Sequence, residues 1–214
     1  MVKENYNIID AYIENNKQLI IFISGLSGTN KSKIAQTLSK ELNLEYLNTR
    51  DYINKENAKE VELPNKETIK VYNDYDWDKI IEIIKKNKGI VVVGEYFPTD
   101  KLKDIESTIH FHIKLAKQNL IKKRIDYIKS LNEEEQKKYK DETTETLIIN
   151  QIIYPYYLEM LQKSKINRFI NANDFFDLKE EDFNESIINK IFKEIIDYII
   201  ENLKNKNLDK YIVY

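Results

Sequence analysis

The chain has 214 residues, which fits one sizeable domain with a single hydrophobic core. Hydrophobic residues make up 42% of it and charged residues 33%, and the formal net charge is −2, so no basic surplus indicates nucleic-acid binding. The absence of cysteine excludes disulfides and thiolate metal sites. No segment approaches the roughly 18 consecutive apolar residues of a membrane span, and residues 1–17 lack the apolar core of a secretory signal. We therefore expect a cytoplasmic protein without membrane or nucleic-acid partners.

Apolar patterns with strand and helix periodicity alternate along the chain. Residues 19–24 and 89–97 are nearly continuous apolar runs, typical of strands buried on both faces of a parallel sheet. Strands that alternate with helices predict βαβ units, so we expect an α/β fold with helices on both faces of the sheet. In order, we predict a helix at 5–17, a strand at 19–24, a helix at 31–42, a strand at 44–47, a β-hairpin at 61–72, a helix at 77–86, strands at 89–97 and 108–115, helices at 116–131 and 144–163, a strand and loop at 167–174, and a helix at 184–204.

Residues 19–38, LIIFISGLSGTNKSKIAQTL, join a predicted strand to a predicted helix through a loop with two glycines and a Lys-Ser pair. This is the pattern of a phosphate-binding P-loop, G-x-x-x-x-G-K-[ST], except that Asn30 replaces the second glycine. Such a loop aims backbone N–H groups at phosphate oxygens, at the positive end of a helix. The predicted nucleotide-binding residues are Gly25, Ser27, Gly28, Thr29, Asn30, Lys31, Ser32 and Lys33.

Asn30 decides whether the loop keeps its shape. Asparagine tolerates the left-handed backbone conformation better than other residues with a side chain, and Gly28 lies two residues earlier. We therefore expect the phosphate cradle to survive at a strain of about 1–2 kcal/mol. The alternative is an ordinary strand-to-helix turn with an incidental Lys-Ser pair.

Beyond this loop, the chain resembles the uridine kinase family of P-loop nucleoside kinases, the group that includes the phosphoribulokinases. The resemblance implies a P-loop NTPase-type three-layer α/β/α fold with a mainly parallel five-stranded sheet, a small β-hairpin and a helical lid. It implies one kinase-like domain over residues 1–214, with a core at 18–175, a lid region at 116–145 and a C-terminal helix at 182–204. The segments that carry it, in the family's order, are LIIFISGLSGTNKSKIAQTL, YLNTRDYINK, NDYDWDKIIEII, GIVVVGEYF, TIHFHIKLAKQNLIKKRIDYI and IINQIIYPYYLEMLQKSKINRFINAND.

The resemblance also implies roles for individual residues. Asp51 matches the general base that deprotonates the acceptor hydroxyl, although a shift of one position would bring Arg50 to that place. Lys31 and Arg124 match the cations that stabilise the transferring phosphoryl group. Ser32 and Glu95 match the Mg²⁺ site, with Gly94 before Glu95 where the family has the reverse order. ATP and Mg²⁺ are thus the implied cofactors.

The acceptor site is implied less directly. The family's ribose-binding aspartate falls on Asn73, and the adjacent Asp74 is the other possibility. Asp76 also fits a helix N-cap, and Trp77 fits the core better than a stacking platform. The predicted substrate-binding residues are Asp51, Tyr52, Asn73, Asp74, Glu95 and Tyr96.

Several positions depart from the family pattern. Lys122 and Lys123 stand where the lid carries arginines, and either role, phosphate contact or solvated helix face, fits them. The family's base-recognising hairpin is missing before residue 89, and the hairpin at 61–72 comes earlier in the chain. If that hairpin closes over the acceptor, Glu62 and Tyr72 would contact it. His110 and His112 alternate in a strand without nearby acids, which favours packing over metal binding.

We therefore expect an ATP-dependent kinase that phosphorylates the hydroxyl of a nucleoside-like small molecule. A nucleoside monophosphate kinase is the closest alternative, but it would need more than three arginines around its acceptor phosphate. A nucleotide-binding regulatory or interaction protein without transfer activity is the other. The isoleucines of the 184–204 helix cover a wide arc, so a homo-oligomer is also possible.

Overall fold

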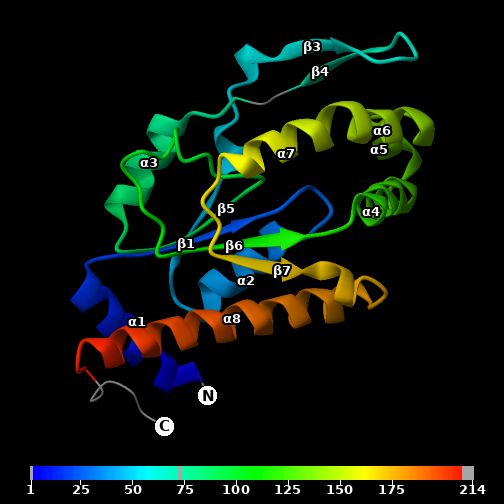
Figure 1. The fold of residues 1–214 in the computed structure, drawn as a ribbon. Coiled ribbons are helices and arrows are strands. Elements are labelled where there is room, and N and C mark those ends of the chain that lie inside the picture. Colours follow the sequence, from blue (N-terminus) through cyan, green and yellow to red (C-terminus); the bar gives the residue numbers. More distant parts are fainter. Residues whose placement is uncertain (1, 72–73, 209–214) are drawn as a thin grey trace.

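A five-stranded parallel sheet forms the centre of the computed structural model, which describes residues 2–71 and 74–208. The strand order is β2–β5–β1–β6–β7 (Figure 1). All six residues of β1 are buried, as expected for a central strand that is apolar on both faces. The strands of this sheet are β1 (Leu19–Ser24), β2 (Glu45–Asn48), β5 (Gly89–Gly94), β6 (Ile109–Lys114) and β7 (Arg168–Asn171).

Helices cover both faces of the sheet and give the predicted three-layer α/β/α fold. One buried cluster joins one face of β1 to α1, α2 and α8, and the other joins the opposite face to α3 and the end of α7. Strands in this order leave the carboxyl ends of β1, β2, β5 and β6 at one edge of the sheet. The helices are α1 (Val2–Asn16), α2 (Lys31–Glu41), α3 (Trp77–Lys86), α4 (Lys117–Ser130), α5 (Glu133–Gln136), α6 (Glu142–Ile148), α7 (Tyr154–Gln162) and α8 (Glu180–Asn205).

The predicted hairpin is an antiparallel pair, β3 (Lys59–Glu62) and β4 (Thr68–Val71), separate from the main sheet. In Figure 1 it lies above α6 and α7. Its tip contacts the segment that begins α6: the Glu67 carboxylate pairs with the Lys140 ammonium at 2.7 Å, and the Asn65 amide donates to the Thr144 hydroxyl at 3.1 Å. These contacts attach the hairpin to the lid region.

Some predicted boundaries were wrong. The single helix expected at 144–163 contains a π-helical turn, Ile149–Ile153, between α6 and α7. The C-terminal helix starts at Glu180, because three acidic residues in its first turn favour the positive end of the helix dipole. The strand expected at 89–97 ends at Gly94.

No helix in the described residues is both long and apolar enough to cross a membrane.

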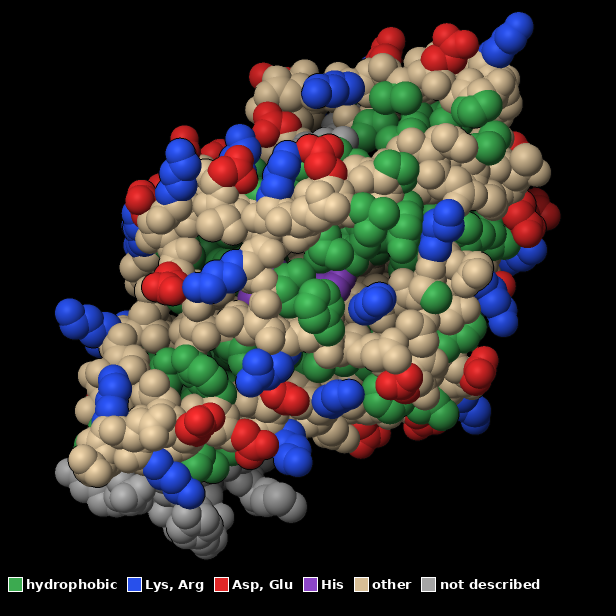
Figure 2. All heavy atoms as spheres, viewed as in Figure 1, with side chains coloured by type: hydrophobic (Ala, Val, Ile, Leu, Met, Phe, Trp, Pro, Cys, Tyr) green, Lys and Arg blue, Asp and Glu red, His purple; other side chains and the backbone are tan. Residues whose placement is uncertain are grey.

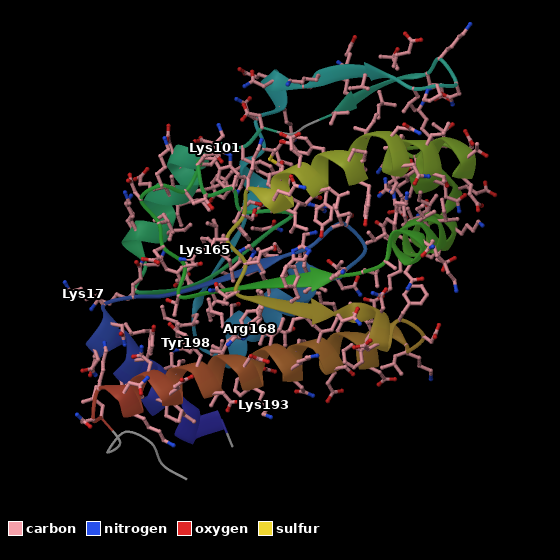
Figure 3. All side chains as sticks on the ribbon, viewed as in Figure 1. Lys17, Lys101, Lys165, Arg168, Lys193 and Tyr198 are labelled. Carbon is pink, nitrogen blue, oxygen red and sulfur yellow. The ribbon has the colours of Figure 1, made fainter. Side chains whose placement is uncertain are left out.

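Each of the three arginines pairs with a glutamate. Arg168 on β7 donates through Nε to Glu194 of α8 at 3.1 Å, an ion pair that joins the edge strand to the helix below it (Figure 3). This pair is exposed, so its contribution to stability is small. Arg50 and Arg124 form their pairs beyond the carboxyl ends of the strands, where the candidate site lies.

Candidate functional site

The loop between β1 and α2 depends on two glycines. A Cβ atom on Gly25 would lie 2.9 Å from both the Ile113 carbonyl oxygen and the Thr29 hydroxyl, closer than packed atoms approach. Gly28 has a φ of +97°, which side-chain-bearing residues rarely adopt. The loop can therefore pass close to β6 and turn into α2 only with glycine at these positions.

Asn30 adopts the left-handed backbone conformation that asparagine tolerates, as predicted. Its φ is 55° and its ψ is 18°, and it stands as the residue before the first turn of α2. Its side chain donates to Oδ1 of Asn184 on α8 at 3.1 Å, so it is bound to the opposite helix. Asn184 is itself buried, and its Nδ2 has no partner in the described residues. Asn184 was not predicted as a site residue, because 154 residues separate it from the loop.

Backbone donors of the loop remain free. Within the described part of the chain, the N–H groups of Gly28, Asn30 and Lys31 have no hydrogen-bond partner, whereas that of Thr29 donates to the Leu26 carbonyl at 3.2 Å. The N–H groups that open a helix have no intrahelical acceptor and carry its partial positive charge. Such a set of donors can bind an anion.

Lys31 is a buried cation that forms no salt bridge with another described residue, although the Glu95 carboxylate acts on it from a distance. Only 4% of it is exposed, and its ammonium makes no hydrogen bond or ion pair with any other described residue. Burial lowers the pKa of Lys31 to about 8, Glu95 opposes this effect and Arg50 adds to it. A buried charge is costly unless it is paired, so this position favours an anionic ligand.

Two cavities meet beside the loop. The loop cavity, about 580 Å³, is lined mainly by polar residues, among them Gly28, Asn30, Lys123 and Tyr127. The isoleucine cavity, about 290 Å³, extends from the loop toward α7 and the hairpin. The residues that line both cavities are Ser27, Arg50 and Arg124. A group bridging the cavities would therefore pass between two guanidinium groups.

Arg50 and Glu95 form an ion pair at the mouth of both cavities. Arg50 follows β2, Glu95 follows β5, and Nη2 of Arg50 lies 2.8 Å from Oε1 of Glu95. The two strands are neighbours, so the residues after their carboxyl ends come together. Of the predicted substrate residues, Glu95 and Tyr96 line the isoleucine cavity. Arg50 was not predicted as a site residue, although the scarcity of arginine in this chain was a signal.

The lid helix α4 presents Arg124 to both cavities. Nε of Arg124 donates to Oε2 of Glu145 at 3.2 Å, and its guanidinium lies 4.7 Å from the Tyr139 ring centroid. Glu145 on α6 is buried and also accepts the Lys140 N–H at 3.0 Å, so Arg124 is held by a fixed partner. Lys122 lies over the Phe176 ring and Lys123 over the Phe183 ring. Of these two lysines, Lys123 alone is among the residues that line the loop cavity.

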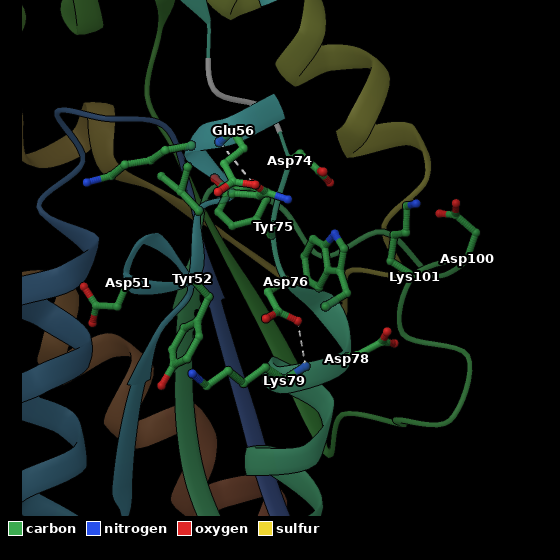
Figure 4. A pocket seen from close by; sticks show the side chains of 14 residues that line it. Asp51, Tyr52, Glu56, Asp74, Tyr75, Asp76, Asp78, Lys79, Asp100 and Lys101 are labelled. Carbon is green, nitrogen blue, oxygen red and sulfur yellow. Dashed lines mark hydrogen bonds between the residues drawn. The ribbon is translucent and has the colours of Figure 1, made fainter. Parts of the chain in front are cut away.

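Asp51 lies apart from the isoleucine cavity. It borders a wide, shallow hollow of about 790 Å³ that we call the acidic hollow, and in Figure 4 it points away from Asp76, Asp78 and Asp100. The Tyr46 phenol connects it to the loop. Burial raises the pKa of that phenol, the interaction with the Ser32 hydroxyl lowers it, and the Asp51 carboxylate raises it further. Ser32 and Asp51 thus both influence the Tyr46 phenol.

Other predicted acceptor residues lie in the acidic hollow. Tyr52 and Asp74 line it, and Oδ2 of Asp74 accepts from Asn57 at 2.6 Å. Asp76 caps α3, as predicted, by accepting the Lys79 N–H at 3.1 Å. Trp77 packs against the core with its ring centroid 5.4 Å from that of Tyr75. The predicted contacts Tyr72 and Asn73 lie outside the described residues, and Glu62 is exposed on the hairpin.

A buried chain of hydrogen bonds supports the loop from beneath. Nδ1 of His110 faces the Lys165 carbonyl at 2.8 Å, so it carries the proton, and Nε2 accepts from the Ser24 hydroxyl at 2.7 Å. The Ser24 oxygen in turn accepts from Nδ1 of His112 at 2.8 Å, and Nε2 of His112 accepts from the Tyr157 hydroxyl. Every donor has one acceptor when both rings are neutral. Burial lowers the pKa of His110 to about 4 and that of His112 to about 3, which keeps them neutral.

The available oxygen ligands suit Mg²⁺ only in part. The described residues contain no group of three or more acids, histidines or cysteines that could hold a metal ion by themselves. Ser32 offers a hydroxyl, and Asp51 and Glu95 offer carboxylates that act on Tyr46 and on Lys31 respectively. Mg²⁺ is commonly held by one or two such groups together with substrate phosphates, so these residues fit a shared site.

Two solved kinase structures have this fold. A shikimate kinase from Bacteroides thetaiotaomicron has a TM-score of 0.50 and 12% sequence identity, over 83% of this chain and 98% of that chain. A gluconokinase from Sinorhizobium meliloti 1021 has a TM-score of 0.51 and 10% identity, over 89% and 97% of the two chains. The sequence matches no protein-family model, and no curated protein is significantly similar to it. At these identities the likeness establishes only the fold, which the chain shares with these two kinases, and the likeness to uridine kinases stays a prediction.

Proposed function

We propose that this protein is a phosphotransferase that moves the γ-phosphoryl group of ATP to the hydroxyl of a small molecule. The buried, unpaired ammonium of Lys31 carries the proposal, because it stands beside free backbone N–H groups at the start of α2. A bound polyphosphate would supply the negative charge in contact with the Lys31 ammonium that the described residues do not provide. The two kinases that share the fold support this reading. The uridine- or cytidine-like acceptor implied by the resemblance is the first specific hypothesis to test.

In the proposed reaction, the acceptor oxygen attacks the γ-phosphorus and the bond from that phosphorus to the β–γ bridging oxygen breaks. ADP leaves with the electron pair of that bond, and the hydroxyl proton passes to a carboxylate. Glu95 lines the isoleucine cavity and Asp51 does not, so we assign the proton to Glu95. Lys31 and Arg124 stabilise the charge on the transferring group.

Mg²⁺, when bound, would neutralise charge on the phosphates, and Ser32 with Asp51 would offer it oxygen ligands. This assignment exchanges the roles of Asp51 and Glu95 implied by the resemblance. The protein's own part is mainly positioning and electrostatics, which is what phosphoryl transfer requires.

Two alternatives are separable from this proposal. A monophosphate acceptor would need free cations, yet Arg50 and Arg124 are both paired with glutamates. A nucleotide-binding regulator would bind ATP without transferring its phosphate. An acceptor-dependent release of ADP distinguishes a kinase from such a regulator.

The loop offers a matched pair of lysines for the test. Lys31 is buried and unpaired, whereas Lys33, two residues later, is exposed and lies 3.3 Å from Glu180. We expect Lys31→Met to lower acceptor-dependent ADP release at least 1000-fold, on the scale of losing a transition-state contact, and Lys33→Met to leave it within about twofold. Equal effects of the two variants on ADP release and on ATP affinity would contradict the proposal.

A further inference from the structure

The walls of the isoleucine cavity define the class of acceptor, and this inference rests on the proposed function. We infer that the acceptor is an alcohol with a predominantly apolar body, such as an aromatic or prenyl alcohol, rather than a sugar or nucleoside. The cavity shares Ser27, Arg50 and Arg124 with the loop cavity, so a hydroxyl at that junction would meet the phosphoryl group. The remainder of the molecule would extend into the isoleucine cavity.

Four isoleucines of one helical segment form one wall. Ile148 ends α6, and Ile149, Ile152 and Ile153 belong to the π-helical turn. A π turn inserts a residue into the helix, which changes the direction of its side chains, and such turns are frequent at functional sites. The turn supplies three of the four isoleucines of this wall.

The hairpin forms the opposite wall. Side chains along β4 alternate in exposure, so that Ile69 and Val71 are half-buried and Lys70 between them is exposed, and all three line the cavity. The hairpin does contribute to this cavity, with two apolar side chains and Lys70 instead of the predicted Glu62. Figure 2 shows hydrophobic side chains gathered along this side of the molecule, between the hairpin and the helices below it.

Of the four charged side chains that line the cavity, Arg50, Glu95 and Arg124 are paired near the loop, whereas Lys70 on the hairpin is exposed. Arg50 pairs with Glu95 at 2.8 Å and Arg124 with Glu145 at 3.2 Å. A nucleoside or sugar acid would bring several hydroxyls or a carboxylate against isoleucine, and buried polar groups without partners are costly. An apolar body gains from the same surface, since removing apolar area from water is favourable.

The size of the cavity also fits this class. Its volume of about 290 Å³ is at the lower end of the range for small-molecule sites, so it would hold one ring or a short branched chain. A single hydroxyl at the polar end is enough for transfer, because Glu95 lines that end. The chemistry required of the acceptor is thus one alcohol group and a compact apolar body.

Two measurements test the inference with the whole protein. Acceptor-dependent ADP release is compared for benzyl alcohol, 2-phenylethanol and geraniol against uridine, cytidine, gluconate and shikimate, with ATP and Mg²⁺ present. Binding of the same compounds is measured calorimetrically with a non-hydrolysable ATP analogue. We expect binding and ADP release with apolar alcohols, and neither with the polar compounds.

Substitutions in the cavity wall test whether the apolar alcohol binds in the isoleucine cavity. Ile148→Thr and Ile152→Thr place a hydroxyl in the cavity wall and should raise the KM for the apolar alcohol about tenfold with the KM for ATP unchanged, while Ile152→Val should behave almost like the wild type. Ile196→Thr on α8 is the control, because Ile196 is equally half-buried and lies outside both cavities.

The outcomes separate the two proposals. Binding of apolar alcohols that depends on Ile152, without ADP release for any compound, would support the acceptor class and overturn the phosphotransferase. ADP release with uridine, gluconate or shikimate and not with apolar alcohols would overturn the acceptor class and support the phosphotransferase. Apolar alcohols that fail to bind, or bind equally to the Ile148→Thr and Ile152→Thr variants, would also overturn the acceptor class.

Discussion

The phosphate end and the acceptor end of the site are built in different ways. The loop from Gly25 to Lys33 is one continuous segment, and its ligand groups are backbone N–H donors and one buried ammonium. The isoleucine cavity draws its walls from separate segments of the chain, and its character comes from side chains. In the proposed reaction, the first kind of site would hold the polyphosphate, and the second would select the molecule that receives the phosphoryl group. The loop can therefore persist while the acceptor changes.

The largest expected effect distinguishes the two carboxylates at the junction of these regions. Glu95→Gln removes the proton acceptor and should lower kcat by about 100- to 1000-fold, with the KM for ATP little changed. Asp51→Asn should lower kcat less than Glu95→Gln and should raise the Mg²⁺ concentration needed for half-maximal activity. The rate of ADP release, measured at varied concentrations of ATP and of Mg²⁺, gives kcat, the KM for ATP and the Mg²⁺ requirement of each variant. A greater loss of kcat in Asp51→Asn than in Glu95→Gln would restore the base role that the resemblance implies.

The buried hydrogen-bond chain through His110 and His112 should make the free energy of unfolding depend on pH. His110 and His112 have folded-state pKa values of about 4 and about 3, below the ordinary value of about 6.5, because burial disfavours their charged forms. His110, Lys114 and Lys31 further disfavour charge on His112. The unfolded chain then binds more protons than the folded chain between pH 6.5 and 4. The free energy of unfolding should therefore fall on acidification through this window, by up to about 1.4 kcal/mol per pH unit for each histidine.

Urea denaturation at pH 7, 6 and 5 measures this slope. The His110→Gln and His112→Gln double variant is the comparison, because it lacks both titrating rings and keeps the carboxylates that titrate below pH 5. We expect the wild type to lose more stability than the variant between pH 7 and 5. Parallel losses in the two proteins would show that the histidines do not titrate as their burial requires.

The sequence predicted the backbone of the loop well because the information for it is local, whereas phosphate binding by the loop stays a prediction. The apolar run of β1, the spacing from Gly25 to Lys31 and the left-handed tolerance of Asn30 all lie within about a dozen residues. The alternation of His110 and His112 also places both on one face of β6 by the two-residue period of a strand. What it could not supply was the Ser24 hydroxyl between them, which comes from a neighbouring strand 86 residues away.

The acceptor end was predicted less well for the same physical reason. The π-helical turn at Ile149–Ile153 left no sign in the apolar pattern, which is equally consistent with a regular helix. Asp51 and Glu95 each come after a strand. Their side-chain directions decide that Asp51 lines the acidic hollow and Glu95 lines the isoleucine cavity. Those directions depend on the local turn after each strand, which a strand-end pattern does not specify.

The smallest expected effect concerns Asn30, which links the loop to α8. Asn30→Gly keeps the left-handed conformation but leaves Oδ1 of Asn184 without its donor, so we expect a loss of about 1 kcal/mol in the free energy of unfolding. Asn30→Ala loses the same hydrogen bond and must also hold a φ of 55°, which should add about 1 kcal/mol. Urea denaturation of both variants measures the two terms, and calorimetry should show that Asn30→Gly binds ATP as the wild type does. The Asn30 side chain is bound to Asn184, so we expect it to leave the phosphate cradle clear. A higher ATP affinity in Asn30→Gly would mean instead that this side chain obstructs the cradle.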